Sequence, residues 1–434
     1  MFKNFLNPVA SFGKKAANGA INVVKTAVAV VAIAVTVGSL ASCDKNDGPS
    51  NSFDNRSTAA ADYTQSSLPV VTVSGDITSN TTWSASNVYE INGIVTVRNG
   101  ATLTINAGTY IKSTANTPGT PNGVLVVAKD GSINAVGTEC NPIVFTSRYL
   151  LDGNNTTVGT PGDFGGIILL DDAQINDPAG TRLIEGLPDD PKFYYGSSSN
   201  ANNAASLGQF RYVRIEYAGY ELAPNIEVNG LTMGGVGSGT TINNVQVSWG
   251  LDDGFEWFGG TVNASNLVAY ANDDDQFDFD LGYTGTLSNS VAIAKDCSTH
   301  SGGGTPDSNG AEIDNNPDDN CGAFPQTEVT FSNVSIWGTS SAANAGLYEN
   351  GVHVRRGATL FVNNSTVTGY NRGVFVEAST GACEFAEVEN SNIHGYMSAG
   401  NFTNVIGNVT STADPAPWFP ASYTACWVKF HDCN

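Results

Sequence analysis

Short apolar runs alternate with Gly- and Asn-rich turns along most of the chain, and several of these runs resemble one another. In the clearest pair, Asn244–Trp257 and Asn266–Phe279, matched positions lie 22 residues apart. A period in the low twenties is typical of one turn of a right-handed parallel β-helix, whose coils stack about 4.8 Å apart. We therefore expect an all-β fold, a right-handed parallel β-helix solenoid that forms a single elongated domain over residues 68–410.

Alternation along the strands of this pair predicts which side chains face the core, because neighbouring side chains of a strand point to opposite faces. The aromatic side chains are expected to point inward, at Phe255, Trp257, Phe277 and Phe279. The acidic side chains are expected to point outward, at Glu256, Asp278 and Asp280.

An asparagine followed by an aliphatic residue also recurs, at Asn244, Asn266, Asn333, Asn392 and Asn404. Such asparagines can stack at successive coils, each amide bonding to the next. Asparagine is also a common turn residue, and both interpretations stay open at this point.

A basic and then apolar leader precedes this region. Four lysines precede an apolar run, Thr26–Ala41. This run is too short to span a bilayer comfortably. Leu40–Cys43 has the pattern of a lipobox, with small residues before a cysteine available for acylation. We predict a lipoprotein signal peptide over residues 1–42, lipidation of Cys43 and a flexible tether over residues 43–67; the alternative is a marginal transmembrane anchor. Residues 411–434 are predicted to form a C-terminal cap over one end of the solenoid.

The composition is acidic, with a formal net charge of -22. Cleavage before Cys43 would remove four lysines and no acid, which lowers the charge to -26. A nucleic-acid partner is excluded, because a phosphate backbone needs a basic surface. Six cysteines remain after Cys43, and export favours disulfides. Spacing alone leaves fifteen connectivities; we favour Cys297 with Cys321, which would close a polar loop.

The chain resembles the pectin-lyase-like right-handed β-helix lipoproteins of the Bacteroidota surface. The residues that carry this resemblance are Gly100–Ile105, Pro142–Ser147, Gly165–Leu169, Tyr212–Gly219 and Asp252–Trp257. The resemblance implies an outer membrane lipoprotein, exposed at the cell surface, but it implies no reaction.

Stacked carboxylates are the main candidates for chemistry. The 22-residue period places Asp252 by Asp274, Asp253 by Asp275, and Glu256 by Asp278. Hard cations such as Ca²⁺ take several carboxylate oxygens, so a metal site is predicted at Asp252, Asp253, Asp274, Asp275 and Asp278. A glycan or other polar ligand is predicted at Asp252, Asp253, Glu256 and Asp278. The alternative is a solvated acidic turn without function.

An enzymatic alternative comes from a resemblance to polygalacturonase-type glycoside hydrolases, which are β-helices with carboxylates on successive coils. The matching residues are Asp253, Asp274, Asp275, His300 and Arg355. His300 lacks the flanking glycines of that family, and the basic pair lacks its lysine. Convergence of the five in one cleft would favour this alternative.

One further alignment concerns the coils near residue 360. Asn350–Arg355 aligned with Arg372–Glu377 predicts an ion pair between Arg355 and Glu377. It also places His353 beside Phe375, as a packed core histidine.

The favoured function is therefore a non-catalytic, lipid-anchored cell-surface β-helix that binds a glycan, a divalent cation or an outer-membrane partner such as a transporter. The alternative is a polysaccharide hydrolase or lyase that uses the stacked carboxylates.

Overall fold

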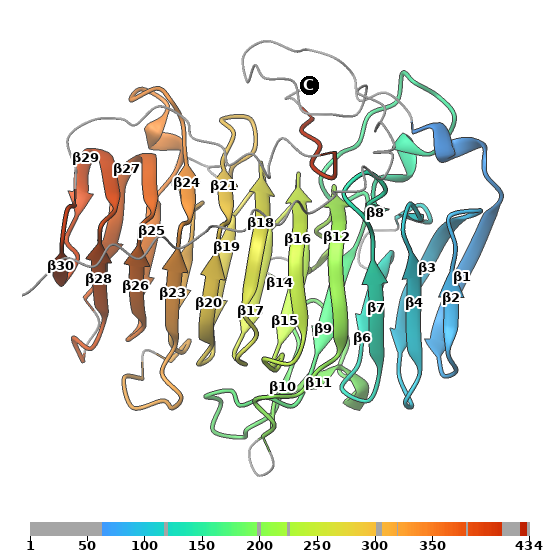
Figure 1. Ribbon diagram of the computed structural model, residues 1–434, viewed down its shortest axis with the longest axis horizontal. Coiled ribbons are helices and arrows are strands. Elements are labelled where there is room, and N and C mark those ends of the chain that lie inside the picture. The colour runs from blue at the N-terminus through green and yellow to red at the C-terminus, as the bar shows by residue number, and fades with distance from the viewer. Residues whose placement is uncertain are drawn as a thin grey trace, which may run out of the picture. The chain divides into compact units, whose positions relative to one another are not determined.

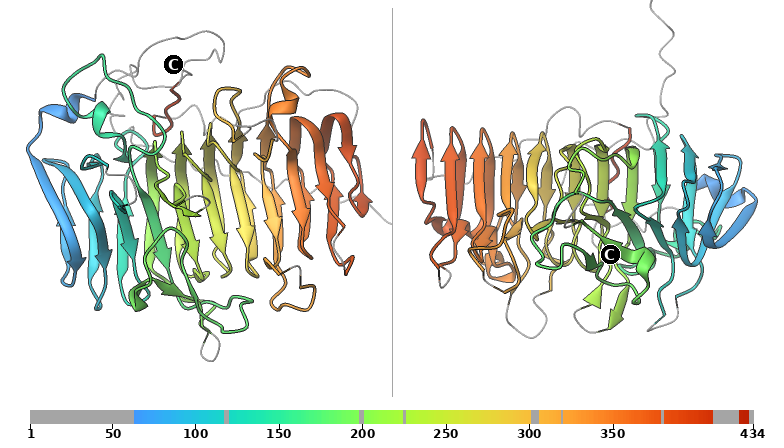
Figure 2. Two further views of the ribbon diagram at one scale, coloured as in Figure 1. Left: turned by 180° about the vertical axis from the view of Figure 1, so that it is seen from behind. Right: turned by 90° about the horizontal axis from the view of Figure 1, so that it is seen from below.

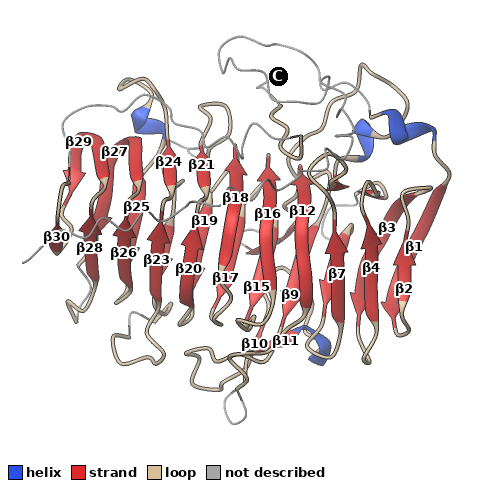
Figure 3. Cartoon of the chain, in the orientation of Figure 1, coloured by secondary structure: helices blue, strands red, loops and turns tan. Residues whose placement is uncertain are grey.

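The structure is a computed structural model, and it describes residues 63–409, apart from 117–119, 198–200, 224–225, 301–305, 319 and 379–380, together with residues 426–431. Within these residues, 26 strands pair in parallel with the strands of neighbouring coils, which confirms the right-handed parallel β-helix (Figure 1). Strands dominate and helical segments are short (Figure 3). None of the described helices is both long enough and apolar enough to cross a membrane.

Each coil contributes to three sheets. The first sheet contains β2 (Thr81–Trp83), β4 (Thr102–Asn106), β7 (Ser132–Val136), the first halves of β12 (Gly208–Glu216), β16 (Thr241–Ser248) and β18 (Ala264–Tyr270), and then β20 (Thr284–Ser288), β23 (Glu328–Ser332), β26 (Thr359–Asn363), β28 (Phe385–Glu389) and β30 (Asn404–Ile406).

The second sheet contains the first halves of β1 (Val70–Ile77) and β3 (Val88–Val97), β5 (Tyr110–Ser113), β8 (Ile143–Phe145), the second halves of β12, β16 and β18, β21 (Val291–Ile293), β24 (Ser335–Trp337), the start of β27 (Thr366–Val376) and β29 (Asn392–Gly400).

The third sheet contains the second halves of β1 and β3, then β6 (Val124–Val127), β9 (Gly166–Leu170), β15 (Leu231–Gly234), β17 (Phe255–Phe258), β19 (Phe277–Asp280), β22 (Glu312–Asp314), β25 (Asn350–Arg355) and the end of β27.

Loops between coils carry the remaining elements (Figure 2). They are the antiparallel pairs β10 (Arg182–Leu183) with β11 (Tyr194–Tyr195) and β13 (Glu221–Ala223) with β14 (Ile226–Glu227), and the short 3-10 helices η2 (Thr64–Ser67), η3 (Arg148–Leu150), η4 (Pro191–Phe193) and η5 (Ala345–Leu347).

Asparagines form the corners between the first and second sheets. Residues with φ between 46° and 59° stand at this corner in successive coils, at Asn244, Asn266, Asn289, Asn333, Asn364 and Asn390. Asparagine tolerates this left-handed conformation better than most residues. One pair of these corner amides is joined directly, with Asn333 Nδ2 donating to Asn289 Oδ1 at 2.7 Å. The turn interpretation therefore explains most of the recurring asparagines, whereas Asn392 and Asn404 begin strands.

The core confirms the predicted register and alternation. Phe255 pairs with Phe277 and Trp257 with Phe279, 22 residues apart, and all four side chains are buried inside the solenoid. The rings of Trp257 and Phe279 stack with centroids 4.4 Å apart. Each stacked pair adds about 0.5–1.5 kcal/mol beyond the burial of its area, so this stretch holds successive coils tightly in register.

The described residues at the two ends of the domain make contacts that the sequence did not suggest, while residues 43–62, 410–425 and 432–434 lie outside the described residues. Tyr63, near the end of the segment expected to be a flexible tether, is buried, and its hydroxyl donates to the Glu216 carboxylate at 3.0 Å, whereas none of Thr64–Ser67 is buried. The tail does not cap a solenoid end within residues 426–431. Trp427 and Val428 pack on the outer side of the second sheet, and Trp249 donates to the carbonyl of His431 at 3.1 Å (Figure 1).

The predicted Cys297–Cys321 disulfide is also wrong. Cys321 bonds to Cys383, across a sequence separation of 62 residues. Cys140 and Cys297 take part in other disulfides. Loop proximity in sequence misled the prediction, because a solenoid brings residues together that are one or more coils apart.

Candidate functional site

The outer face of the third sheet carries two rows of charged side chains. The strand register aligns the first row as Glu256, Asp278, Glu312 and His353. The second row contains Asp280, Asp314 and Arg355, each two residues further along its strand. These positions point outward because their neighbours Trp257, Phe279, Ile313 and Val354 fill the core.

The acidic residues are less exposed than a solvated turn would be. Asp253, Asp275 and Glu256 have relative exposures of 8%, 5% and 5%. A hydrophobic cluster that includes Tyr195 and Phe258 covers neighbouring parts of the same sheet. The interpretation as a solvated acidic turn therefore does not hold for these three residues.

A ladder of side-chain oxygens positions the turn before each strand of this sheet. Oδ1 of one residue accepts from the backbone N–H of the equivalent residue in the next coil, and the ladder runs through Asn229, Asp253, Asp275, Asn309 and Asn350 at 2.5–3.1 Å. Each rung satisfies a buried backbone donor that the turn would otherwise leave unpaired. Asp253 and Asp275 thus have a structural role as well as a charge.

The first carboxylate group comprises Asp253, Glu256 and Asp278, whose ligand oxygens lie within 4.8 Å of one another. The amide of Asn229 donates to Glu256 Oε2. Asp278 Oδ1 is buried and has no hydrogen-bond partner among the described residues. Burial, followed by repulsion between the acids, raises the pKa of each of these three carboxyls well above its usual range.

The second group comprises Asp275, Asp278 and Glu312, again within 4.8 Å. Here positive charge is present: Arg355 bonds to Glu312 and, at 2.8 Å, to Asp314. Burial and then Asp314 raise the pKa of Glu312 to about 8, although Arg355 acts in the opposite direction. The negative charge at this end of the two rows is therefore offset in part by the positive charge of Arg355.

The predicted Arg355–Glu377 ion pair is wrong, whereas His353 is buried and packed as predicted but lies outside the solenoid core. Arg355 turns to the preceding coil, where Glu312 and Asp314 offer two carboxylates. His353 does stand beside Phe375 in register, but both point outward, because Val352 and Val354 face the core. Nε2 of His353 contacts Glu377 at 2.8 Å.

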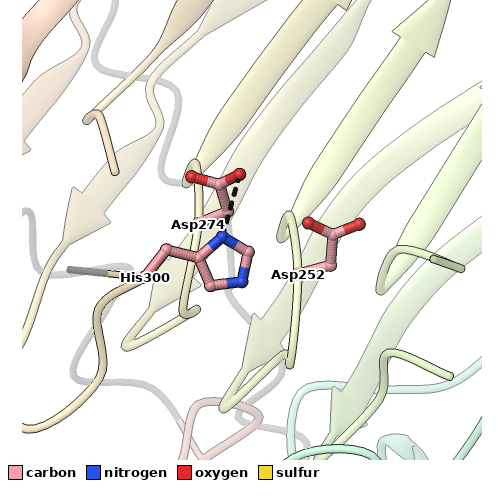
Figure 4. A group of neighbouring side chains, drawn as sticks. All are labelled: Asp252, Asp274 and His300. Atoms are coloured by element: carbon pink, nitrogen blue, oxygen red, sulfur yellow. Dashed lines mark ion pairs between the residues drawn. The ribbon is translucent and has the colours of Figure 1, made fainter. Parts of the chain in front are cut away.

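The third group lies at the turn before the strands and comprises Asp252, Asp274 and His300 (Figure 4). His300 Nδ1 lies 3.2 Å from Asp274 Oδ2, and Nε2 lies 3.1 Å from the carbonyl oxygen of Leu251. The hydrogen bond to Asp274 is the main reason that the pKa of His300 is raised to about 10. At neutral pH this histidine is a cation within the acidic turn.

The five residues of the enzymatic alternative are thus divided among neighbouring groups. Asp253 and Asp275 are consecutive rungs of the ladder, Asp274 pairs with His300, and Arg355 binds Glu312 and Asp314. The sequence analysis missed Glu312 and Asp314 because a long loop interrupts the 22-residue period before β22. The alternation in Glu312-Ile313-Asp314 matches Asp278-Phe279-Asp280 and is the signal that could have found them.

A comparison with family models matches residues 75–424 to the pectate-lyase like beta helix domain. The chain belongs to this family. The match runs from the second half of β1 through β30 and agrees with the fold described above. Comparisons with curated proteins and with solved structures found no match. Membership of this β-helix family establishes the architecture, and any function has to be argued from the side chains.

Proposed function

We propose that this β-helix is a non-catalytic, lipid-anchored cell-surface protein that binds a divalent cation, with Ca²⁺ as the best-fitting ion, at Asp253, Glu256 and Asp278. The observation that carries the proposal is the buried Oδ1 of Asp278, which has no donor among the described residues and lies in a group of three carboxylates. Ca²⁺ binds oxygen at about 2.3–2.6 Å, so two of its ligands lie at most about 5.2 Å apart. The 4.8 Å limit within this group fits that geometry.

Charge balance supports the same ion. Within the described residues, Arg355 and Arg356 pair with Glu312 and Asp314, and no ion pair reaches Asp253, Glu256 or Asp278. Buried carboxylates without a counter-charge either take up protons or bind a cation. A divalent ion would reverse the repulsion that raises their pKa values.

A bound Ca²⁺ takes six to eight oxygen ligands, and three carboxylates leave several positions for other oxygens. Glycan hydroxyls are suitable ligands, so the cation and the polyhydroxylated ligand expected from the sequence can share one site. Cys43, the basis for the lipid anchor, lies outside the described residues, and the lipobox supports that part of the proposal. An outer-membrane partner such as a transporter belongs to the same proposal and rests on the anchor.

Calcium titration of the protein tests the site. The thermal midpoint of the wild type should be higher in Ca²⁺ than in chelator. At a Ca²⁺ concentration of about 100 times Kd, the free energy of unfolding should increase by about 2.7 kcal/mol. Asp278→Asn should lose most of this gain, because it removes the charge and keeps the side-chain size. Glu139→Gln, at an exposed turn, is the matched control and should keep the gain. An unchanged wild-type midpoint in Ca²⁺ would refute the site.

One observation favours the second candidate, a polysaccharide hydrolase or lyase: Asp252, Asp274 and His300 do come together at the turn. Two features count against it. Inverting hydrolysis needs about 6.5–9.5 Å between its carboxyl groups, whereas one oxygen each of Asp252 and Asp274 lie within 4.8 Å of one another, so this spacing argues against an inverting hydrolase. Arg355, the basic residue of that layout, is held by Glu312 and Asp314.

A further inference from the structure

A second polar region lies on the outer face of the first sheet, where β12, β16 and β18 are neighbours. Its cavity of about 390 Å³ is lined by Arg211 and by hydroxyl and amide side chains that include Thr241, Asn263 and Ser265. No carboxylate lines this cavity. In a chain of net charge -22, such a lining distinguishes this surface from the acidic third sheet.

Arg211 differs from most arginines of the protein. Within the described residues six arginines form salt bridges with carboxylates, namely Arg98, Arg182, Arg214, Arg355, Arg356 and Arg372. Arg211 forms none with any described residue, and its Nε is buried without a hydrogen-bond partner there. The buried Nε is out of reach of a ligand from solvent, so the case for an outside acceptor rests on Arg211 lining the cavity with no carboxylate partner among the described residues.

Three of the neighbouring side chains have a hydrogen that is available for donation. Ser265 Oγ accepts from the amide of Asn243 at 2.5 Å, which leaves its own hydrogen free to donate. Asn263 Oδ1 accepts from the backbone of Thr286 at 2.8 Å, which leaves its NH₂ group to donate. The Thr241 hydroxyl makes no hydrogen bond within the described part of the chain and lines the same cavity.

We propose that this cavity binds a sulfate or phosphate group carried by a hydroxylated ligand such as a sugar, with Arg211 as the main anion ligand. Arg presents a rigid fork of N–H groups that matches such an anion. Hydroxyl and amide donors at Thr241 of β16, at Ser265 of β18 and at Asn263 just before β18 match its remaining oxygens. The site lies on a different sheet from the carboxylate groups and does not depend on the proposed cation site.

Calorimetric titration tests the proposal, in chelator, with inorganic sulfate, inorganic phosphate, glucose 6-sulfate and glucose as probes. The wild type should bind the three anions and not glucose. Tighter binding of glucose 6-sulfate than of inorganic sulfate would support a sugar-borne ligand, and equal binding would support the free anion. A single charged contact is expected to give a Kd of up to about 10 mM. The proposal would be overturned if none of the three anions bound at about that concentration.

Matched variants locate the site. Arg211→Gln should weaken anion binding at least tenfold, and Thr241→Val should weaken it about threefold. The difference is expected because hydrogen bonds from a charged group are stronger than those from a neutral one. Arg148→Gln is the control, because Arg148 lies near the Tyr149 ring and lines no part of this cavity. If Arg211→Gln does not fold, Arg211→Lys, which keeps the charge but loses the fork, should still weaken binding. Equal losses in Arg148→Gln and Arg211→Gln would also overturn the proposal.

Discussion

The Oδ1 atom of Asp253 accepts a hydrogen bond of 2.9 Å from the backbone N–H of Asp275, the residue directly above it in the next coil. The carboxylate of Asp275 in turn accepts from the backbone of Asn309. Asparagine fills the equivalent position at Asn229, Asn309 and Asn350. The ladder therefore needs a short side chain with an acceptor oxygen and does not need a charge, which separates the structural role of the aspartates from their chemistry.

This separation predicts different results for two changes at one position. Asp253→Asn keeps the acceptor and should leave the stability in chelator unchanged or slightly higher, because it removes a repelling charge. Asp253→Ala leaves the N–H of Asp275 unpaired and should cost about 1–3 kcal/mol. Denaturant unfolding of both variants measures the difference, and equal stabilities would show that the ladder contributes nothing.

The raised pKa values predict how stability depends on pH without metal. Glu312 has a folded pKa of about 8 and Asp280 of about 7, both above their ordinary values because of burial and then Asp314. A raised carboxyl pKa adds stability that is complete below the unfolded pKa and is lost as pH rises through the folded pKa. In chelator the thermal midpoint should therefore fall between pH 5 and pH 8.

Calcium should oppose this trend, because it competes with protons for Asp253, Glu256 and Asp278, whose pKa values burial and neighbouring acids also raise. The gain in midpoint on adding Ca²⁺ should be larger at pH 8 than at pH 5. Scans at the two pH values, each with chelator and with Ca²⁺, provide the measurement. A gain that is the same at both pH values would contradict binding to these carboxyls.

Much of the fold could be predicted because the solenoid repeats local rules. The 22-residue spacing of Phe255 and Phe277 sets the register, and strict alternation places their side chains inward. Those two rules hold wherever coils have equal length. They fail where a loop interrupts the period, as before Glu312. The sequence therefore did not reveal that the acidic rows continue from Asp278 to Glu312.

Partners of individual side chains were harder to predict. Backbone register correctly placed Arg355 near Glu377 of the next coil. The guanidinium instead forms ion pairs with two carboxylates of the preceding coil. A long side chain reaches either coil, and the choice depends on the number of charges on each side. Docking of Tyr63 and of the Trp427 segment was not visible in the sequence, because neither segment has a strand pattern.

Those docked segments meet at Glu216, which is fully buried and accepts from Tyr63 and, at 2.7 Å, from Thr146. Burial raises its pKa, but Arg214 and then His431 outweigh burial and lower it to about 2. Glu216→Gln should cost about 3–5 kcal/mol, because it removes the carboxylate that forms an ion pair with the buried Arg214. Denaturant unfolding beside Glu139→Gln checks this; a loss no larger than in that control would show that the pair is dispensable.

Membrane attachment is predicted to depend on Cys43. Cys43→Ala should move the protein from the membrane fraction to the soluble fraction, because each acyl methylene contributes about 0.8 kcal/mol of partitioning energy. Fractionation followed by a carbonate wash measures the distribution. Retention of the variant in the washed membrane pellet would show that something other than an acyl chain holds the protein there.

The last prediction is that the acidic turn cleaves no polysaccharide. His300 is held as a cation by Asp274, with a pKa of about 10, so it is a poor general base at neutral pH. Incubation of the wild type with pectin, polygalacturonate and other glycans, with and without Ca²⁺, should therefore leave the number of chain ends constant. The same preparation should show the calcium-dependent rise in thermal midpoint, which proves that the inactive protein is folded. New chain ends that disappear in Asp274→Asn would establish the hydrolase or lyase instead, because that change removes the partner of His300 and leaves the Asp253–Asp275 rung intact.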